Sequence, residues 1–419
     1  MRGKDFLDKM ELADPSFVEA ADKPKKKKLR AVKWSALAAC LTLTIFAGIK
    51  LIPQKEPQEE PPQISPDLPV LSISSSLSQG AGTGDILLRD VSELDDENPW
   101  NEEVTLYTLP VYKNPLEYET CYDFYYAANS DYDKMREVLF ETATVLGLDP
   151  ETLTVTDNTT NEKDIEKLLD TAERIGVADI DDYLEKRLTP TTFYGKAEGV
   201  EITVFNDLQV KIEFDPPLSL PDKYDLSANA DRRDISSAMK YIKREYSELI
   251  GCVDPAINIR QAGYDVNIKA IYDCFFFENE GSLTDRIVNY NFFQSSFHGD
   301  EKGELWLIWI DQPDLSNKVG DYPIISVAEA TELLYNGNYV TPSFHEITGE
   351  DTVAMVSLTY RKGMYDEYFI PYYCFYVEVP TDIVWAEENG LKTYGTFYVP
   401  AIESTYIADM PLWNGGMNQ

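Results

Sequence analysis

The side chains of this chain that are best suited to acid–base chemistry near neutral pH are its two histidines, His298 and His345. Each has a serine and a carboxylate nearby in the sequence, in Ser-Ser-Phe-His-Gly-Asp and in Pro-Ser-Phe-His-Glu. The members of a Ser–His–Asp triad meet in space and not as neighbours on one strand, and the sequence has no Gly-x-Ser-x-Gly motif. No His/Cys pair has the spacing of zinc ligands. The histidines therefore predict neither a hydrolase nor a zinc site.

Three acidic clusters could hold a cation. The run Asn129-Ser-Asp131-Tyr-Asp133 alternates oxygen ligands as a calcium loop does, but it lacks the glycine at the sixth position and the distant glutamate. Asp95-Asp96-Glu97 and Asp179-Ile-Asp181-Asp182 are shorter still. Helix caps or solvated turns are the interpretation that we favour at all three places, so the sequence predicts no metal and no other cofactor.

Paired carboxylates and exposed tryptophans would indicate carbohydrate chemistry. The many acidic residues leave a glycosidase pair open, although none is singled out. Trp306, Trp309, Trp385 and Trp413 could stack on sugars if exposed. Trp306 and Trp309 have opposite parity on an expected strand, so they should point to opposite faces. If one face is core, the other tryptophan is a candidate interface residue; a covered second face is the alternative.

The chain has five cysteines. Cys40 lies in an apolar segment, and Cys121, Cys252, Cys274 and Cys374 are far apart without a CxxC motif. An even number permits disulfides. Because Cys274 and Cys374 lie in aromatic, strand-like runs, we favour free buried thiols, which behave as small hydrophobic groups.

The net charge of −36 is unevenly distributed. Residues 1–52 carry 11 of the 37 Lys+Arg and 6 of the 73 Asp+Glu, which leaves 26 basic and 67 acidic residues for the remainder. Such an acidic surface repels nucleic acid, so we expect no nucleic-acid partner. It could attract cationic peptides or divalent ions, although solubility is the simpler explanation.

Residues 34–52 form an apolar run near the lower length limit of a membrane-spanning helix. Its anchoring side chains are Trp34, Leu37, Leu41, Leu43, Ile45, Phe46 and Ile49. The basic cluster before it comprises Lys25, Lys26, Lys27, Lys28, Arg30 and Lys33. The positive-inside rule then predicts a single-pass protein of the cell membrane, with a cytoplasmic N-terminus and its main domain outside. The lipid bilayer is thus an expected partner.

Two alternatives to this anchor stay open. A cleaved signal peptide would need a shorter region before the apolar run, and Lys50 fits a membrane end better than a cleavage site. A lipoprotein is suggested by Leu37-Ala-Ala-Cys40, which looks like a lipobox. However, few apolar residues precede that box, and the apolar run continues after it.

The remaining pattern predicts the domain organisation. Residues 1–33 would be a cytoplasmic tail, and residues 53–102, rich in Pro, Glu, Ser and Gly, a flexible linker. Helical periodicity at 133–146 and 234–250 and alternation at 199–214, 256–272 and 287–310 predict helices and antiparallel strands. The capping box Ser326-Val-Ala-Glu329 begins another helix. We therefore expect an α+β fold of helices on curled antiparallel sheets in two or three lobes, at 103–222, 223–322 and 323–414.

The last of these segments resembles a known family. The runs Ile325-Ser-Val-Ala-Glu-Ala-Thr-Glu-Leu-Leu-Tyr-Asn-Gly, Phe369-Ile-Pro-Tyr-Tyr-Cys-Phe-Tyr-Val and Tyr394-Gly-Thr-Phe-Tyr-Val-Pro-Ala look like the C-terminal part of YycI/YycH-type regulatory proteins and, more loosely, PepSY-like domains. The resemblance covers about 75 residues and rests on pattern. It implies a Gram-positive protein with one anchor and an outer α+β region, which contacts sensor kinases or other membrane partners without catalysis.

Three hypotheses of function follow. The first is a non-enzymatic, membrane-anchored extracytoplasmic protein that modulates a membrane sensor or an envelope process through a membrane or extracytoplasmic protein partner. The second is an ectodomain that binds or modifies cell wall or carbohydrate. The third is a lipoprotein that binds a ligand. An apolar edge or patch would favour the first, and a concave site of acids and tryptophans the second.

Overall fold

The computed structural model describes residues 67–73, 84–121, 124–158, 162–347, 353–363 and 366–415. The predicted tail at 1–33, its basic cluster and the apolar run at 34–52 lie outside these residues. None of the helices within them is long and apolar enough to cross a membrane. The described chain is mostly antiparallel sheet with few helices. The predicted fold class of helices packed on curled antiparallel sheets is therefore corrected to a mainly antiparallel β architecture, while the predicted N-terminal membrane helix lies outside the described residues.

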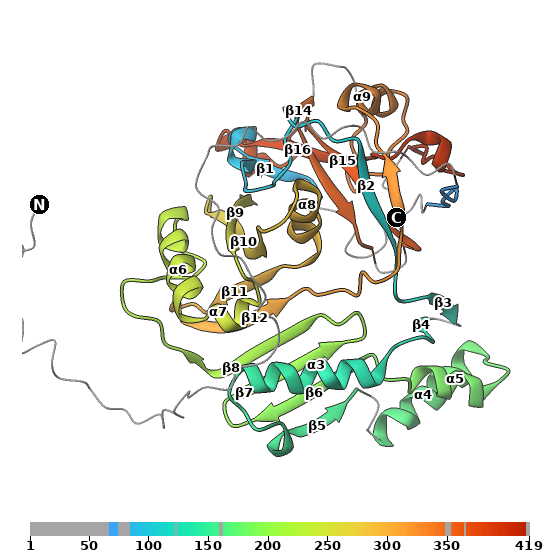
Figure 1. Ribbon diagram of the computed structural model, residues 1–419, viewed down its shortest axis with the longest axis vertical. Coiled ribbons are helices and arrows are strands. Elements are labelled where there is room, and N and C mark those ends of the chain that lie inside the picture. Colours follow the sequence, from blue (N-terminus) through green and yellow to red (C-terminus); the bar gives the residue numbers. More distant parts are fainter. Residues whose placement is uncertain are drawn as a thin grey trace, which may run out of the picture. The chain divides into compact units, whose positions relative to one another are not determined.

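The larger sheet has eight antiparallel strands (Figure 1). In spatial order they are β5 (Thr154–Asp157), β6 (Thr192–Ala197), β7 (Val200–Phe205), β8 (Val210–Leu218), β12 (Leu305–Ile310), β11 (Ser295–Gly299), β10 (Ala270–Glu278) and β9 (Pro255–Tyr264). The predicted hairpins at 199–214 and 256–272 form as β7–β8 and β9–β10. Alternate apolar side chains of these strands, such as Ile202 and Val204 on β7, lie in a core with the apolar faces of two helices, α3 (Tyr132–Val145) and α6 (Arg232–Glu245).

The second sheet has six strands. It comprises β1 (Ile86–Leu88), β16 (Lys392–Pro400), β15 (Tyr368–Val379), β2 (Thr108–Lys113), β13 (Lys318–Pro323) and β14 (Val353–Arg361), which pairs with β15. A separate hairpin joins β3 (Tyr118–Cys121) to β4 (Phe124–Ala127). β15 is buried on both faces: Tyr373 and Phe375 enter one apolar cluster, and Tyr372 and Tyr376 enter another. A strand that is buried on both faces needs apolar side chains at consecutive positions, and this explains the continuous aromatic run in the sequence of β15.

The helices are few and mostly short. They are α3 (Tyr132–Val145), α4 (Glu162–Ile175), α5 (Ile180–Arg187), α6 (Arg232–Glu245), α7 (Ser247–Ile250), α8 (Leu283–Phe292), α9 (Val327–Tyr335) and α10 (Val384–Glu388), with 3-10 turns η1 (Val91–Leu94), η2 (Pro150–Thr152) and η4 (Ser404–Tyr406). The predicted capping box of Ser326 and Glu329 begins α9. Asp231 caps α6, because Asp231 Oδ1 accepts hydrogen bonds from two amides of the first turn.

Three predicted elements differ from the structure for physical reasons. The strand expected from 287 to 297 begins as α8, because Ser282 and Asp285 form a capping box and the buried Ile287 and Asn291 are one helical turn apart. Part of the expected linker is folded, since β1 pairs with β16 and buries Leu88. The described residues belong to one compact unit, and β8 pairs with β12 across the expected boundary between lobes. Both sheets therefore join strands that are distant in the sequence.

Candidate functional site

The two histidines lie on different elements. His298 is on β11, where burial lowers the pKa of its imidazole and the Asp273 carboxylate opposes that shift. The Nε2 atom of His345 lies 3.7 Å from Oδ2 of Asp85 and 4.0 Å from Oδ2 of Asp382. Within the described ranges, no group of three or more His, Cys, Asp or Glu side chains could hold a metal ion. The histidines thus belong to no described metal cluster.

The three acidic clusters act as caps and turns. Asp131 Oδ1 accepts a 2.9 Å hydrogen bond from the amide of Lys134 at the start of α3. Asp179 Oδ1 accepts one of 3.1 Å from the amide of Asp182 at the start of α5. Asp96 Oδ1 accepts one of 3.0 Å from the amide of Asn98. The interpretation as helix caps is confirmed for Asp131 and Asp179, whereas Asp96 lies in a partly buried turn.

The two tryptophans singled out as interface candidates lie on β12 and are both partly buried. The ring of Trp309 packs on Phe205, with 5.5 Å between centroids and 30° between planes. In the pairing of β12 with β11, the register shifts between His298 and Gly299, which makes Trp306 the extra residue of a β-bulge on β12. The bulge breaks the strict alternation on which the parity argument depended. An interface role for Trp306 and Trp309 stays a prediction.

Three of the cysteines are free thiols in the structure: Cys252, Cys274 and Cys374. Burial raises the pKa of the Cys252 thiol to about 11 and those of Cys274 and Cys374 to about 12. A thiol attacks as its thiolate, so these groups are poor nucleophiles at neutral pH. Cys374 is buried, as the sequence led us to expect, whereas Cys252 and Cys274 are only partly buried.

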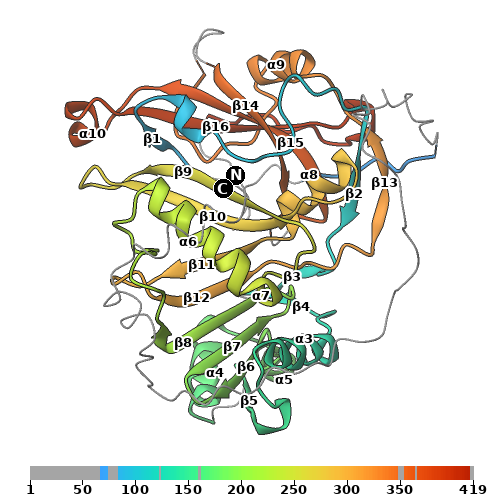
Figure 2. The same ribbon diagram turned by 60° about the vertical axis from the view of Figure 1, so that its left-hand side comes forward.

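A polar cavity of about 360 Å³ lies where the two sheets and α8 meet, and we call it the inter-sheet cavity. In Figures 1 and 2, β9 and β10 run beneath the part of the six-stranded sheet that holds β14 and β15, with α8 beside them. The wall of the inter-sheet cavity combines Arg260 and Asp273 from β9 and β10, Tyr290 from α8, and Arg361 and Tyr376 from β14 and β15. Residues that are more than a hundred positions apart in the sequence therefore line one cavity.

One side of this cavity, the acid end, is formed by Asp96, Asp273 and Arg260. The hydroxyl of Tyr290 donates a 2.7 Å hydrogen bond to Oδ2 of Asp96. Nη2 of Arg260 donates one of 3.1 Å to Oδ2 of Asp273, its partner across the β9–β10 pair. Burial, and then the Asp96 carboxylate, raise the pKa of Tyr290 well above its ordinary value. Tyr290 therefore stays a protonated donor at neutral pH.

The other side, the basic end, is formed by Arg361 and Lys362 at the end of β14. Nη2 of Arg361 lies 3.2 Å from Oδ1 of Asp366, and these side chains are only 2% and 8% exposed. Nζ of Lys362 donates a 2.9 Å hydrogen bond to Oδ2 of Asp311. Burial raises the pKa of Asp366, and the guanidinium of Arg361 opposes that rise. The basic end thus consists of two cations, each held by one carboxylate behind it.

Two asparagines cover the outer edge of β14, between these two ends. Nδ2 of Asn98 donates a 3.1 Å hydrogen bond to the carbonyl oxygen of Leu358. Oδ1 of Asn291 accepts hydrogen bonds of 3.0 Å from the amide of Tyr360 and 3.1 Å from the hydroxyl of Thr359. Side-chain amides can replace a missing neighbouring strand, and this protects the edge from pairing with another chain.

A second pocket of about 320 Å³ adjoins the cavity through Lys362, and we call it the carboxylate pocket. Asp207 and Asp311 line it together with the aromatic rings of Tyr118 and Phe369. Burial, and then the Asp311 carboxylate, raise the pKa of Asp207, while a hydrogen bond from the amide of Gln209 lowers it. Two carboxyl groups with unequal environments are the kind of pair that acid–base catalysis uses.

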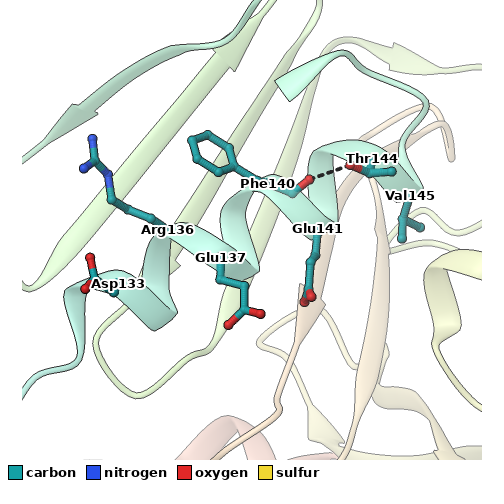
Figure 3. Close-up of a pocket in the computed structure, with 7 residues that line it drawn as sticks. All are labelled: Asp133, Arg136, Glu137, Phe140, Glu141, Thr144 and Val145. Carbon is teal, nitrogen blue, oxygen red and sulfur yellow. Dashed lines mark hydrogen bonds between the residues drawn. The ribbon is translucent and has the colours of Figure 1, made fainter. Parts of the chain in front are cut away.

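The outer face of α3 also borders a shallow hollow (Figure 3). Figure 3 shows its side chains spread along the helix without converging on one point; the drawn hydrogen bond joins the Thr144 hydroxyl to the carbonyl of Phe140 at 2.8 Å. Phe140 and Val145 are 36% and 37% exposed. An open helix surface of this kind lacks the convergent polar groups of a ligand site.

Three exposed apolar side chains lie on the two chain segments that carry His345 and Asp382. Phe344 is 76% exposed, Val384 67% and Ile383 42%. The approach of His345 to Asp382 brings these two chain segments together, because Phe344 and Ile383 are their direct neighbours. We call Phe344, Ile383 and Val384 the apolar patch.

Sequence reasoning singled out Asp96 but missed the other charged groups of the inter-sheet cavity. Arg260 and Asp273 lie within β9 and β10, and Arg361 ends β14. A charge within a strand that also contributes apolar side chains to the core was the available signal, because a charge that becomes partly buried needs a partner. This signal does not identify the side chain that pairs with the charge, because tertiary packing decides which residues of the two sheets meet.

Comparison with known proteins adds little. No family model matches the chain, and no curated protein matches it. Among solved structures, an uncharacterised protein from Eubacterium rectale is similar at 11% sequence identity over 71% of this chain and 84% of its own, with a TM-score of 0.29. The resemblance to YycI/YycH-type proteins and the location at a membrane therefore stay predictions.

Proposed function

We propose that this chain is a non-enzymatic interaction protein that acts by contact with a protein partner. The observation that carries the proposal is the apolar patch of Phe344, Ile383 and Val384. Large apolar side chains scattered singly over a surface need no explanation, but a group of them brought together by tertiary contact is typical of a docking surface. A regulatory role toward a membrane sensor or an envelope process follows from the family resemblance alone.

The ionisable groups of the inter-sheet cavity also favour binding over catalysis. Arg260, Arg361 and Lys362 are each held by one carboxylate. The Cys374 thiol in the same wall has a pKa of about 12, and Tyr290 and Tyr376 have pKa values raised well above 10. A catalytic base or nucleophile works best with a pKa near the working pH. These groups are instead suited to holding a fixed charge pattern.

Site-specific photocrosslinking in cells that naturally express the chain tests the proposal. A photoreactive residue at position 344 should give a discrete protein adduct. The matched control is position 253, since Val253 is 82% exposed but lies away from the patch in the sequence, next to β9. The double variant Phe344→Ser, Val384→Ser should lose the partner on co-purification, and Val253→Ser should keep it. Equal adducts at both positions, or none at 344, would contradict the proposal.

A second candidate function is binding or modification of cell-wall carbohydrate. It is favoured by one observation, the carboxyl groups of Asp207 and Asp311 in a pocket that also contains Tyr118 and Phe369. Sedimentation with purified peptidoglycan and analysis of released sugars would test it. Binding or release that Asp311→Asn abolishes, without a protein adduct at position 344, would favour this function over the first.

A further inference from the structure

The inter-sheet cavity is not used by the docking proposed above, and its charges are arranged along one direction. Its acid end has two carboxylates, Asp96 and Asp273, against a single guanidinium, that of Arg260. Its basic end presents Arg361 and Lys362. The acid end thus has one carboxylate in excess, and the basic end presents two cations that Asp366 and Asp311 hold from behind. Acceptors at one end and N–H donors at the other match a ligand that has both an ammonium group and a carboxylate.

The acid end has unused capacity to accept hydrogen bonds. A carboxylate offers about four acceptor positions. Asp96 receives one hydrogen bond at each oxygen, from Asn98 and Tyr290. Asp273 is bonded through Oδ2 to Arg260, and its side chain is 43% exposed. An ammonium group, which has three donors, could therefore bind between Asp96 and Asp273 without displacing the existing bonds.

At the basic end, Lys362 has N–H donors in addition to the one that Asp311 accepts. An ammonium group such as that of Lys362 has three N–H donors. Among the described residues, Asp311 is its hydrogen-bonded acceptor, and the Lys362 side chain remains 29% exposed. The guanidinium of Arg361 is almost fully buried beside it, over the ring of Tyr372 at 5.2 Å. A carboxylate entering from the cavity would meet the remaining donors of Lys362 and the field of Arg361.

The spacing of the two ends follows from β14. The hydrogen bond from Asn98 to Leu358 places the loop that carries Asp96 beside residue 358. Lys362 is four residues further along, which is about 13 Å at the rise of a strand. An extended chain spans about 3.5 Å per residue, and a hydrogen bond adds about 3 Å at each end. Two or three residues therefore bridge the distance.

We propose that the inter-sheet cavity binds a short zwitterionic peptide of two or three residues, with its ammonium group at Asp96 and Asp273 and its carboxylate at Lys362 and Arg361. Thr359 lines the wall between the two ends and faces the peptide groups, and Ser357 lines the wall at the acid end. A volume of about 360 Å³ suits a ligand of this size. The chain's net charge of −36 repels anions at long range, but a zwitterion carries no net charge.

Isothermal titration of the full-length protein with trialanine, N-acetyl-trialanine and trialanine amide tests each end separately. Trialanine should bind, and blocking either terminus should weaken binding about tenfold or more, because each block removes a charge-assisted contact. Asp96→Asn should weaken the binding of trialanine, but it should not further weaken the binding of N-acetyl-trialanine. Lys362→Gln should weaken the binding of trialanine, but it should not further weaken the binding of trialanine amide. Lys392→Gln, which removes an exposed lysine paired with Glu378, is the control that should change nothing.

Two results would overturn the inference. Equal affinity for the three peptides would show that neither end is recognised, and absence of binding at millimolar trialanine would show that the cavity is not a peptide site. The three peptides are compared on the unmodified protein, so the outcome does not depend on whether a variant folds. Loss of this binding would leave the proposed docking through Phe344 untouched, since that is tested by crosslinking.

Discussion

Oδ1 of Asn291, on α8, accepts a 3.0 Å hydrogen bond from the backbone amide of Tyr360, on β14. The same oxygen accepts a hydrogen bond from the hydroxyl of Thr359, and the Asn291 amide donates one of 2.8 Å to the carbonyl of Ile287. One buried side chain thereby links a helix to the free edge of the six-stranded sheet. This link also forms part of the wall of the inter-sheet cavity.

Replacing Asn291 by alanine should lower the free energy of unfolding by about 1–3 kcal/mol, because the buried amide of Tyr360 would lose its acceptor. Urea denaturation followed by circular dichroism measures this change. Asn289→Ala is the matched control: it makes the same exchange on α8, at a partly buried position. If the two variants lose equal stability, the hydrogen bond to β14 contributes nothing.

Gly299 should not tolerate a side chain. It ends β11, and a Cβ atom there would lie 2.5 Å from the carbonyl oxygen of Leu226, which belongs to the backbone and cannot rotate away. Gly299→Ala should therefore lower the free energy of unfolding by about 1–3 kcal/mol, as overpacking does. Gly84→Ala, where a Cβ would meet nothing within 4 Å, should be neutral. Thermal denaturation of both variants decides whether Gly299 is needed for this close approach.

The local elements of the fold could be predicted from the sequence better than their assembly. The capping box at Ser326 and the β7–β8 hairpin follow from local chemistry, and both form. The helix α8 was taken for a strand, because its buried residues include adjacent positions such as Ile287 and Val288 that fit either period. The pairing of β2 with β15 depends on which distant strands pack together, which no local pattern contains.

The candidate site illustrates the same limit. Asp96 was recognised as part of an acidic turn, and the structure confirms that its Oδ1 accepts the amide of Asn98. Its other oxygen bonds Tyr290, which is 194 positions away. Burial and long-range pairing decide the properties of such groups, so composition alone could not separate them from solvated acids.

The thiol of Cys252 should react slowly with alkylating reagents while the protein is folded. Burial raises its pKa from an ordinary 9.0 to about 11, so at pH 8 its thiolate fraction is roughly a hundredfold lower than in the unfolded chain. Pulses of iodoacetamide with peptide mass spectrometry, in buffer and in urea, measure both rates. The folded rate should rise about tenfold per pH unit up to pH 10. A plateau near pH 9 in the folded protein would mean an ordinary thiol.

The carboxyl group of Asp207 should make stability fall as pH rises. Burial, and then the neighbouring Asp311 carboxylate, raise its pKa above the ordinary 3.8, so the folded protein holds this proton more tightly than the unfolded chain does. Its contribution is therefore complete below pH 3.8 and is lost as pH rises through the folded-state pKa. Asp207→Asn imitates the protonated acid, so the variant should gain stability relative to the unmodified protein between pH 4 and pH 7.

The control is Asp222→Asn, at an exposed position. Its free energy of unfolding, measured by urea denaturation across this pH range, should change with pH in parallel with that of the unmodified protein. Parallel curves for Asp207→Asn as well would show that Asp207 ionises as freely in the folded protein as in the unfolded chain, and would remove the main support for an acid–base pair in the carboxylate pocket.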